Sequence, residues 1–151
     1  MADNGEILIR RLGPDDRDLA REAFTVMADV FGEAHTRLSD RYVDGLLARP
    51  EFWAFASIDA GRAVGGLTGH TLPMTAFEGS EVFLYDIAVS PAYQRRGIGR
   101  RLVTALCQEA ARQGISTMFV PVDDDDAEAL RFYAALGGAP SKVTLFEFTS
   151  S

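Results

Sequence analysis

The 151-residue sequence has little of what several classes of protein require. It contains one cysteine, Cys107, and two histidines, so an internal disulfide is excluded and a dedicated structural zinc site is not expected. No apolar run approaches the length of a membrane span. Residues 1–13 show no basic segment followed by an apolar one. We therefore expect a cytoplasmic protein with no metal site and no membrane partner.

Positive charge is also scarce. Lys and Arg total 15 against 22 Asp and Glu, which gives a net charge of -7. A field of this sign repels phosphate backbones, so nucleic acid is not an expected partner, whereas a polycation would be attracted. Solubility alone explains such a charge until the acidic residues are placed in the fold.

What the chain does have is an alternation of strand and helix patterns. Apolar strand patterns occupy residues 6–12, 52–58, 63–72, 81–89, 115–122 and 142–148. Helical patterns occupy residues 14–31, 40–49, 97–112 and 126–138. The residues 59–62, DAGR, form a typical hairpin turn. This order predicts a single α/β (α+β) domain over residues 1–151, with a mixed sheet covered by helices on both faces.

Glycine and arginine occur together where the 81–89 strand gives way to a helix. The N–H groups of a helix start lack intrahelical partners and attract anions, and Gly97 and Gly99 place no Cβ in front of them. Four arginines supply cationic donors for phosphate oxygens, namely Arg95, Arg96, Arg100 and Arg101. The segment predicts a pyrophosphate site, with an ordinary basic helix start as the alternative. A Walker loop and a dinucleotide fingerprint are excluded, because the required Gly-Lys-Ser/Thr and third glycine are missing.

Residues 94–99, QRRGIG, fit the Arg/Gln-x-x-Gly-x-Gly/Ala signature of the GNAT superfamily of acetyl-CoA-dependent N-acetyltransferases. Residues 85–94 resemble the strand of that family whose backbone pairs with the pantetheine arm, and residues 126–133 resemble its Asn-x-x-Ala-x-x-x-Tyr helix, with Asp for Asn. The resemblance covers essentially the whole chain. It implies the GNAT fold, with a mostly antiparallel sheet of about six to seven strands and about four helices, acetyl-CoA as cofactor, direct transfer in a ternary complex, and a homodimer.

Several segments are most similar to the type I aminoglycoside 3-N-acetyltransferases, among them residues 10–16, 31–33 and 80–90. That similarity implies acetylation of the 3-amino group of an aminoglycoside antibiotic such as gentamicin. Two alternatives stay open: the same chemistry on a polyamine, a peptide or a small metabolite amine, and a non-catalytic acyl-CoA-binding module. The resemblance also implies the coenzyme-binding residues, which are Ile87, Ala88, Val89, Gln94, Arg95, Arg96, Gly97, Ile98, Gly99, Arg100, Asp126 and Tyr133.

Acetyl transfer to an amine needs a base, and Asp86 is the first candidate. An aspartate within an apolar strand is costly to bury unless it is paired, which predicts a bulge or an amine-facing site there. A hydrogen-bonded or salt-bridged structural acid is the alternative. Glu81, nearer the start of the strand, is the second candidate. The resemblance implies that Tyr133 protonates the thiolate. We expect Cys107 to be a core thiol rather than a nucleophile.

The acidic run at residues 122–128 follows a predicted strand and precedes a helix. Such a run is usually a solvated cap, and Asp126 suits a helix N-cap. Beside a coenzyme site, however, several carboxylates favour a polycationic small-molecule amine. The residues expected to bind this substrate are Asp86, Asp123, Asp124, Asp125, Asp126 and Glu78.

Overall fold

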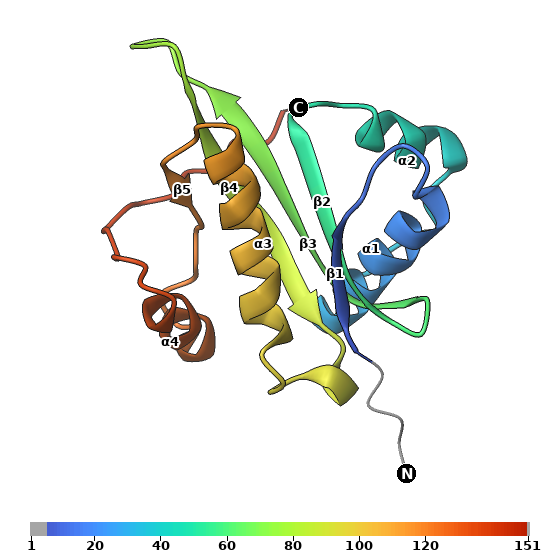
Figure 1. Ribbon diagram of the computed structural model, residues 1–151. Helices are drawn as coiled ribbons and strands as arrows, with labels where there is room; N and C mark the ends of the chain where they lie inside the picture. The colour runs from blue at the N-terminus through green and yellow to red at the C-terminus, as the bar shows by residue number, and fades with distance from the viewer. Residues whose placement is uncertain (1–5, 151) are drawn as a thin grey trace. The chain divides into compact units, whose positions relative to one another are not determined.

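The computed structural model describes residues 6–150, and the chain divides into two compact units, Met1–Val120 and Pro121–Ser151. In the described part, the first unit holds five strands and three α-helices (Figure 1). The strands are β1 (Leu8–Arg11), β2 (Phe52–Asp59), β3 (Arg62–Pro73), β4 (Ser80–Val89) and β5 (Met118–Phe119). The helices are α1 (Arg17–Phe31), α2 (Asp40–Leu47) and α3 (Ile98–Arg112), with a short 3-10 helix, η1, at Pro91–Tyr93. The second unit contains α4 (Ala127–Ala135).

The sheet has the order β1-β2-β3-β4-β5, in which the first four strands are antiparallel neighbours and β5 runs parallel to β4. The mixed, mostly antiparallel sheet and its helices confirm the predicted fold class. The DAGR turn is confirmed as well, because Asp59 pairs with Arg62 and both turn residues, Ala60 and Gly61, have positive φ.

Helices cover both faces of this sheet (Figure 1). Alternate residues of β2 divide between the two faces. One set packs with α1 and α2 in a core of alanine and aliphatic side chains, which include Ala20, Ala23, Val43, Leu47, Ala54, Ala56 and Ile58. Gly66 of β3 allows α1 to lie close, because a Cβ there would stand 3.3 Å from the Cβ of Ala23. The other face packs under α3, where Leu102 and Leu106 are fully buried.

The prediction of a C-terminal strand at residues 142–148 is wrong. No strand forms there, and the side chains of Val143, Leu145, Phe146 and Phe148 are at least 75% exposed. A strand needs a neighbour for its backbone groups, and none pairs with this segment within residues 6–150. The strand predicted at 115–122 shrinks to the two residues of β5 and is not buried, so the sheet has five strands rather than six to seven.

Helix positions agree more closely with the predictions. Ser39 caps α2 by accepting a hydrogen bond from the N–H of Tyr42, and Asp126 caps α4 in the same way. The first helical pattern was expected to begin at residue 14, but α1 begins at Arg17. The intervening residues form a turn, in which the Asp16 carboxylate accepts from the N–H of Gly13 at 2.7 Å.

Candidate functional site

A β-bulge interrupts β4 at Tyr85. Thr68 of β3 pairs with Asp86 and Gly69 pairs with Leu84, so Tyr85 has no partner of its own on β3. A bulge of this kind bends a strand and redirects neighbouring side chains. The bulge expected from an aspartate in an apolar strand is therefore present, and it lies next to Asp86.

The Asp86 carboxyl lies in a partly desolvated and acidic environment. Burial raises its pKa above the ordinary value, and the negative charge of Glu33, just after α1, raises the pKa further. The charge of His70 acts in the opposite direction. Asp86 has no ion pair with Lys or Arg among the described residues, so the structure does not bear out a salt-bridged structural acid.

Aromatic rings surround His70, whose charge acts on Asp86. The His70 ring lies 5.4 Å from Phe52, 6.5 Å from Phe83 and 5.6 Å from Tyr85, measured between centroids. Phe83 in turn stacks on Phe119 of β5. We call Glu33, His70, Tyr85 and Asp86 the acidic cluster. It combines carboxylates with aromatic faces, and both attract an organic ammonium group.

The far edge of β4 is open beyond the cluster. Within the described residues, β5 pairs with β4 only at Val82 and Phe83. The N–H of Ser90 donates to Val64 of β3 at 2.8 Å. Since backbone groups of an antiparallel strand alternate between its two neighbours, those of Ile87 and Val89 point toward the open edge. An extended ligand lying along this edge would meet an N–H and a C=O from Ile87.

Residues 94–100, which we call the phosphate segment, join this edge to α3. Arg101 makes the first helical hydrogen bond, to the C=O of Gly97, so the preceding N–H groups of Ile98, Gly99 and Arg100 have no intrahelical partner. Gly97 has φ of +77° and a Cβ there would meet no atom within 4 Å. Arg95 also has a positive φ, of 63°. Successive N–H groups in such a turn form a concavity that binds anions.

The side chains of the phosphate segment divide into two groups. Gln94 donates from Nε2 to the C=O of Val89 at 2.8 Å, which ties the segment to β4. Arg95 and Arg100 are exposed, and the Arg96 guanidinium lies over the ring of Tyr93. Arg101 was expected to join the cationic donors, but its guanidinium instead donates to the C=O of Ile7.

Two other predicted residues belong to the first unit. Glu81 precedes Asp86 by five positions on β4, roughly 15 Å along an extended strand, and Glu78 is exposed in the β3–β4 loop. In the second unit, Asp123, Asp124 and Asp125 are exposed, and the Asp126 carboxylate accepts from the N–H of Ala129 at 3.0 Å. Burial, with a contribution from Asp126, raises the pKa of Tyr133 to about 12.

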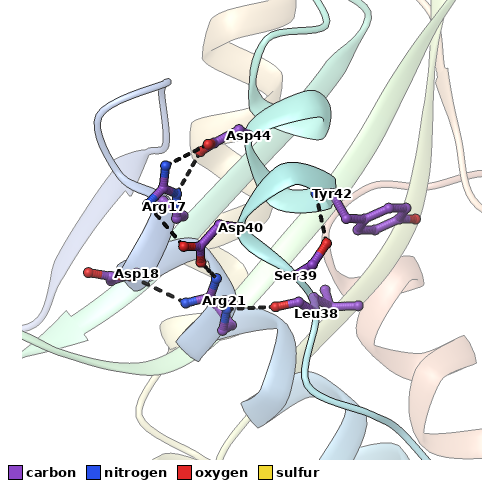
Figure 2. A network of polar contacts seen from close by, with 8 residues as sticks. All are labelled: Arg17, Asp18, Arg21, Leu38, Ser39, Asp40, Tyr42 and Asp44. Carbon is purple, nitrogen blue, oxygen red and sulfur yellow. Dashed lines mark hydrogen bonds and ion pairs between the residues drawn. The ribbon is translucent and has the colours of Figure 1, made fainter.

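A network of arginines and aspartates holds α2 against α1 and fixes the C-terminal end, at Leu38, of the connection that carries Glu33 (Figure 2). Arg21, only 8% exposed, donates to the C=O of Leu38 at 3.0 Å and pairs with Asp18 and Asp40. Arg17 makes two hydrogen bonds to Asp44, of 2.8 and 2.6 Å. Such forked pairs hold a fixed geometry.

The expectation that Cys107 is a core thiol is wrong, because its side chain is exposed. Its position on α3 is one residue beyond the buried stripe that includes Leu106 and Ala110. Partial desolvation nevertheless raises the thiol pKa, which disfavours the nucleophilic thiolate. Within residues 6–150 there is no group of three or more His, Cys, Asp or Glu side chains arranged to hold a metal ion. The described helices also include none long and apolar enough to cross a membrane.

Sequence reasoning named His70 as a possible wall residue of the acceptor site but did not link it, Glu33 or Tyr85 to Asp86. They come from the loop just after α1, from β3 and from the bulge in β4, and no spacing in the sequence links them. The one local signal was the aspartate itself, which marked the bulge.

The chain was compared with known proteins. Residues 17–137 match the model of the acetyltransferase (GNAT) family. The chain belongs to this family. Among GNAT proteins of known structure, an aminoglycoside acetyltransferase from an uncultured soil metagenomic sample, in complex with trehalose, is 30% identical over all of both chains, with a TM-score of 0.91. The same enzyme in complex with sisomicin is 28% identical over 96% of this chain and 97% of that one, also with a TM-score of 0.91.

Curated GNAT relatives match over shorter stretches. The [ribosomal protein bS18]-alanine N-acetyltransferase of Escherichia coli (strain K12) is 40% identical over 57 residues, 38% of each chain. The L-2,4-diaminobutyric acid acetyltransferase of Nocardia farcinica is 30% identical over 96 residues, 61% of this chain and 48% of that protein. The matches thus span less than half the length of these curated relatives.

Proposed function

We propose that residues 1–151 act as a single acetyltransferase domain that uses acetyl-CoA to acetylate the 3-amino group of an aminoglycoside by direct transfer in a ternary complex. The observation that carries the acceptor class is the 30% identity and TM-score of 0.91 to an aminoglycoside acetyltransferase over the full length of both chains. The position on the sugar rests on the sequence similarity to the 3-N-acetyltransferases. Resistance to the antibiotic would follow.

The described residues fit the coenzyme. The phosphate segment offers free N–H groups, open space at Gly97 and exposed guanidinium groups for the phosphates. The open edge of β4 at Ile87 and Val89 offers backbone groups for the pantetheine amides. When bound, acetyl-CoA supplies the activated acetyl group. In this proposal Ala88, Ile98, Asp126 and Tyr133 complete the binding residues.

In this proposal one side chain accepts a proton and another donates one. Asp86 accepts a proton from the acceptor ammonium, directly or through water, and its raised pKa makes it a better base than an exposed aspartate. Glu81 is the second candidate for this role. Tyr133, with a pKa of about 12, keeps its hydroxyl proton at neutral pH and is therefore a donor rather than a base. Cys107 takes no part, which agrees with direct transfer.

The acceptor chemistry follows from the acidic side chains. Asp86 and Glu33 place two carboxylates in one cluster, and a unit charge pair at 4 Å is worth about 1 kcal/mol in water and about 4 kcal/mol at an effective dielectric of 20. The exposed carboxylates of Asp123, Asp124, Asp125 and Glu78 would add weaker, salt-sensitive attraction. A polyamino sugar presents several ammonium groups to such a surface.

A peptide N-terminus is the second candidate acceptor, because the Escherichia coli alanine acetyltransferase shares 40% identity over 57 residues. A thiol-release assay over sisomicin, gentamicin, spermidine, 2,4-diaminobutyrate and an alanyl peptide separates the acceptors. We expect turnover with the two aminoglycosides, and NMR of the product should place the acetyl group on the 3-amino nitrogen. Turnover with the peptide alone would reassign the acceptor. Coenzyme binding without turnover on any amine would favour a non-catalytic acyl-CoA-binding module.

We further propose that the enzyme is a cytoplasmic homodimer. Val143, Leu145, Phe146 and Phe148 expose apolar side chains on a segment with strand-forming composition, and a second copy is the partner that such a segment fits. Light scattering should give twice the mass of the chain, and Phe148→Asp should shift the protein toward monomer. A monomeric parent protein would refute this part of the proposal.

A further inference from the structure

The β2–β3 hairpin contacts the phosphate segment through Tyr93. The Tyr93 hydroxyl, in η1, donates a hydrogen bond of 2.6 Å to Oδ2 of Asp59, at the end of β2. Tyr93 also contacts Arg96, whose guanidinium carbon lies 5.1 Å from the centroid of the Tyr93 ring. Asp59, Tyr93 and Arg96 thus form a continuous chain of contacts from the hairpin to the segment, which we call the Asp59–Tyr93–Arg96 chain.

Two members of the Asp59–Tyr93–Arg96 chain lie on either side of a strained residue, Arg95. Arg95 has φ of +63°, a left-handed conformation that is uncommon for a residue with a side chain and persists where the surroundings fix it. Tyr93 precedes Arg95 by two positions and Arg96 follows it directly. On the N-terminal side, the N–H of Tyr93 also donates to Ser90 at 2.8 Å. The backbone is therefore held on both sides of the unfavourable φ.

We propose that Asp59 and Tyr93 are positioning residues for coenzyme binding, which hold Arg95 and Gly97 in the turn that presents free N–H groups to the phosphates. This inference rests on the proposed function of the phosphate segment. Without the hydrogen bond and the ring, Arg95 relaxes toward negative φ, and the peptide groups that follow it turn away from the concavity.

Removing the charge of Asp59 distinguishes a positioning role from a purely electrostatic effect on coenzyme binding. A carboxylate near a phosphate site repels the ligand, so an electrostatic role predicts tighter binding when Asp59 is removed. A positioning role predicts weaker binding. Asp59→Asn keeps an acceptor oxygen for the Tyr93 hydroxyl and removes the charge, whereas Asp59→Ala removes both.

The test measures binding of acetyl-CoA by calorimetry and turnover with S-acetyl-pantetheine, which lacks the nucleotide phosphates. We expect Tyr93→Phe and Asp59→Ala each to weaken acetyl-CoA binding about tenfold, and the double variant to be no weaker than either one, because both remove the same hydrogen bond. Tyr93→Leu, which also removes the ring under Arg96, should weaken binding more. Asp59→Asn should retain affinity within about threefold. S-acetyl-pantetheine turnover should stay unchanged in all five variants.

Arg62→Gln is the matched control, because Arg62 lies in the same hairpin and loses only its surface contact with Glu22. It should bind acetyl-CoA like the parent. Unchanged affinity in Tyr93→Phe, additive losses in the double variant, or equal losses with S-acetyl-pantetheine would each overturn the positioning role. A folded parent protein that gives no heat with acetyl-CoA would instead overturn the proposed function itself.

Discussion

The acidic cluster and the phosphate segment both adjoin β4, yet they are assembled in opposite ways. The acidic cluster is made of side chains from three separate elements, and its properties depend on charges brought together by folding. The phosphate segment is seven consecutive residues, and most of its binding capacity is backbone. A change of one side chain should therefore remove a chemical function from the cluster, whereas the segment should respond chiefly to changes in backbone conformation.

The largest expected effect of this difference is on turnover. Asp86→Asn keeps the shape of the side chain and removes the base, so kcat with an aminoglycoside should fall by roughly 100-fold or more, while the Kd for acetyl-CoA stays within about twofold. Stopped-flow or coupled kinetics and calorimetry measure the two quantities separately.

Glu81→Gln is the control, since Glu81 lies on the same strand but far from Asp86. It should keep most of the turnover. A loss in Glu81→Gln as large as that in Asp86→Asn would transfer the role of base to Glu81.

The second effect belongs to the phosphate segment. Gly97→Val forces a β-branched residue into φ of +77° and places a Cβ in the concavity, so acetyl-CoA binding should weaken by about tenfold or more. Calorimetry gives the Kd, and kcat at saturating coenzyme should change little.

Gly114→Val is the control for the effect of backbone strain at an end of α3 on acetyl-CoA affinity. Gly114 follows the other end of α3, with φ of +73° and nothing within 4 Å of a built Cβ. The two variants should lose similar thermal stability, and only Gly97→Val should lose affinity. Equal losses of affinity would mean that strain in α3, rather than the concavity, weakens binding.

The same contrast explains which features could be predicted from the sequence. The phosphate segment, the Ser39 and Asp126 caps and the DAGR turn follow local rules, in which residue type and spacing determine the backbone. Glu33 and His70 could not be assigned to Asp86, because their proximity depends on strand register and on where α1 ends. The prediction of a strand at 142–148 was wrong for a related reason. Composition indicates that a segment can form a strand, but a strand also needs a neighbouring strand to pair with.

The acidic cluster makes a prediction for the pH dependence of kcat/KM. Glu33 raises the pKa of Asp86 and His70 lowers it. Because the base must be ionised, activity falls on the acid side as Asp86 is protonated. Glu33→Gln should therefore move the acid limb to lower pH, and His70→Gln should move it to higher pH. Shifts in the same direction for both variants would show that the limb reports another group.

A raised pKa also has a cost in stability. An aspartate whose folded pKa lies above its unfolded value stabilises the fold below the unfolded pKa, and this contribution is lost as the pH rises through the folded pKa. Ionised Asp86 is thus unfavourable to folding at neutral pH. Asp86→Asn should raise the Tm at pH 7 while lowering kcat, and the gain in Tm should vanish in acid, where the carboxyl is neutral.

The smallest effect is expected for Cys107, which belongs to neither region. Its thiol is exposed on α3, with a sulfur contact to Met118 at 3.9 Å and a raised pKa. Cys107→Ala should leave kcat and the Kd for acetyl-CoA within about twofold, since losing one exposed thiol removes little packing. If the thiol instead carried the acetyl group, mass spectrometry of protein incubated with acetyl-CoA alone would find acetylated Cys107, and the alanine variant would be inactive. Direct transfer in a ternary complex predicts neither result, because the acetyl group would pass from the coenzyme to the amine without being bound to this sulfur.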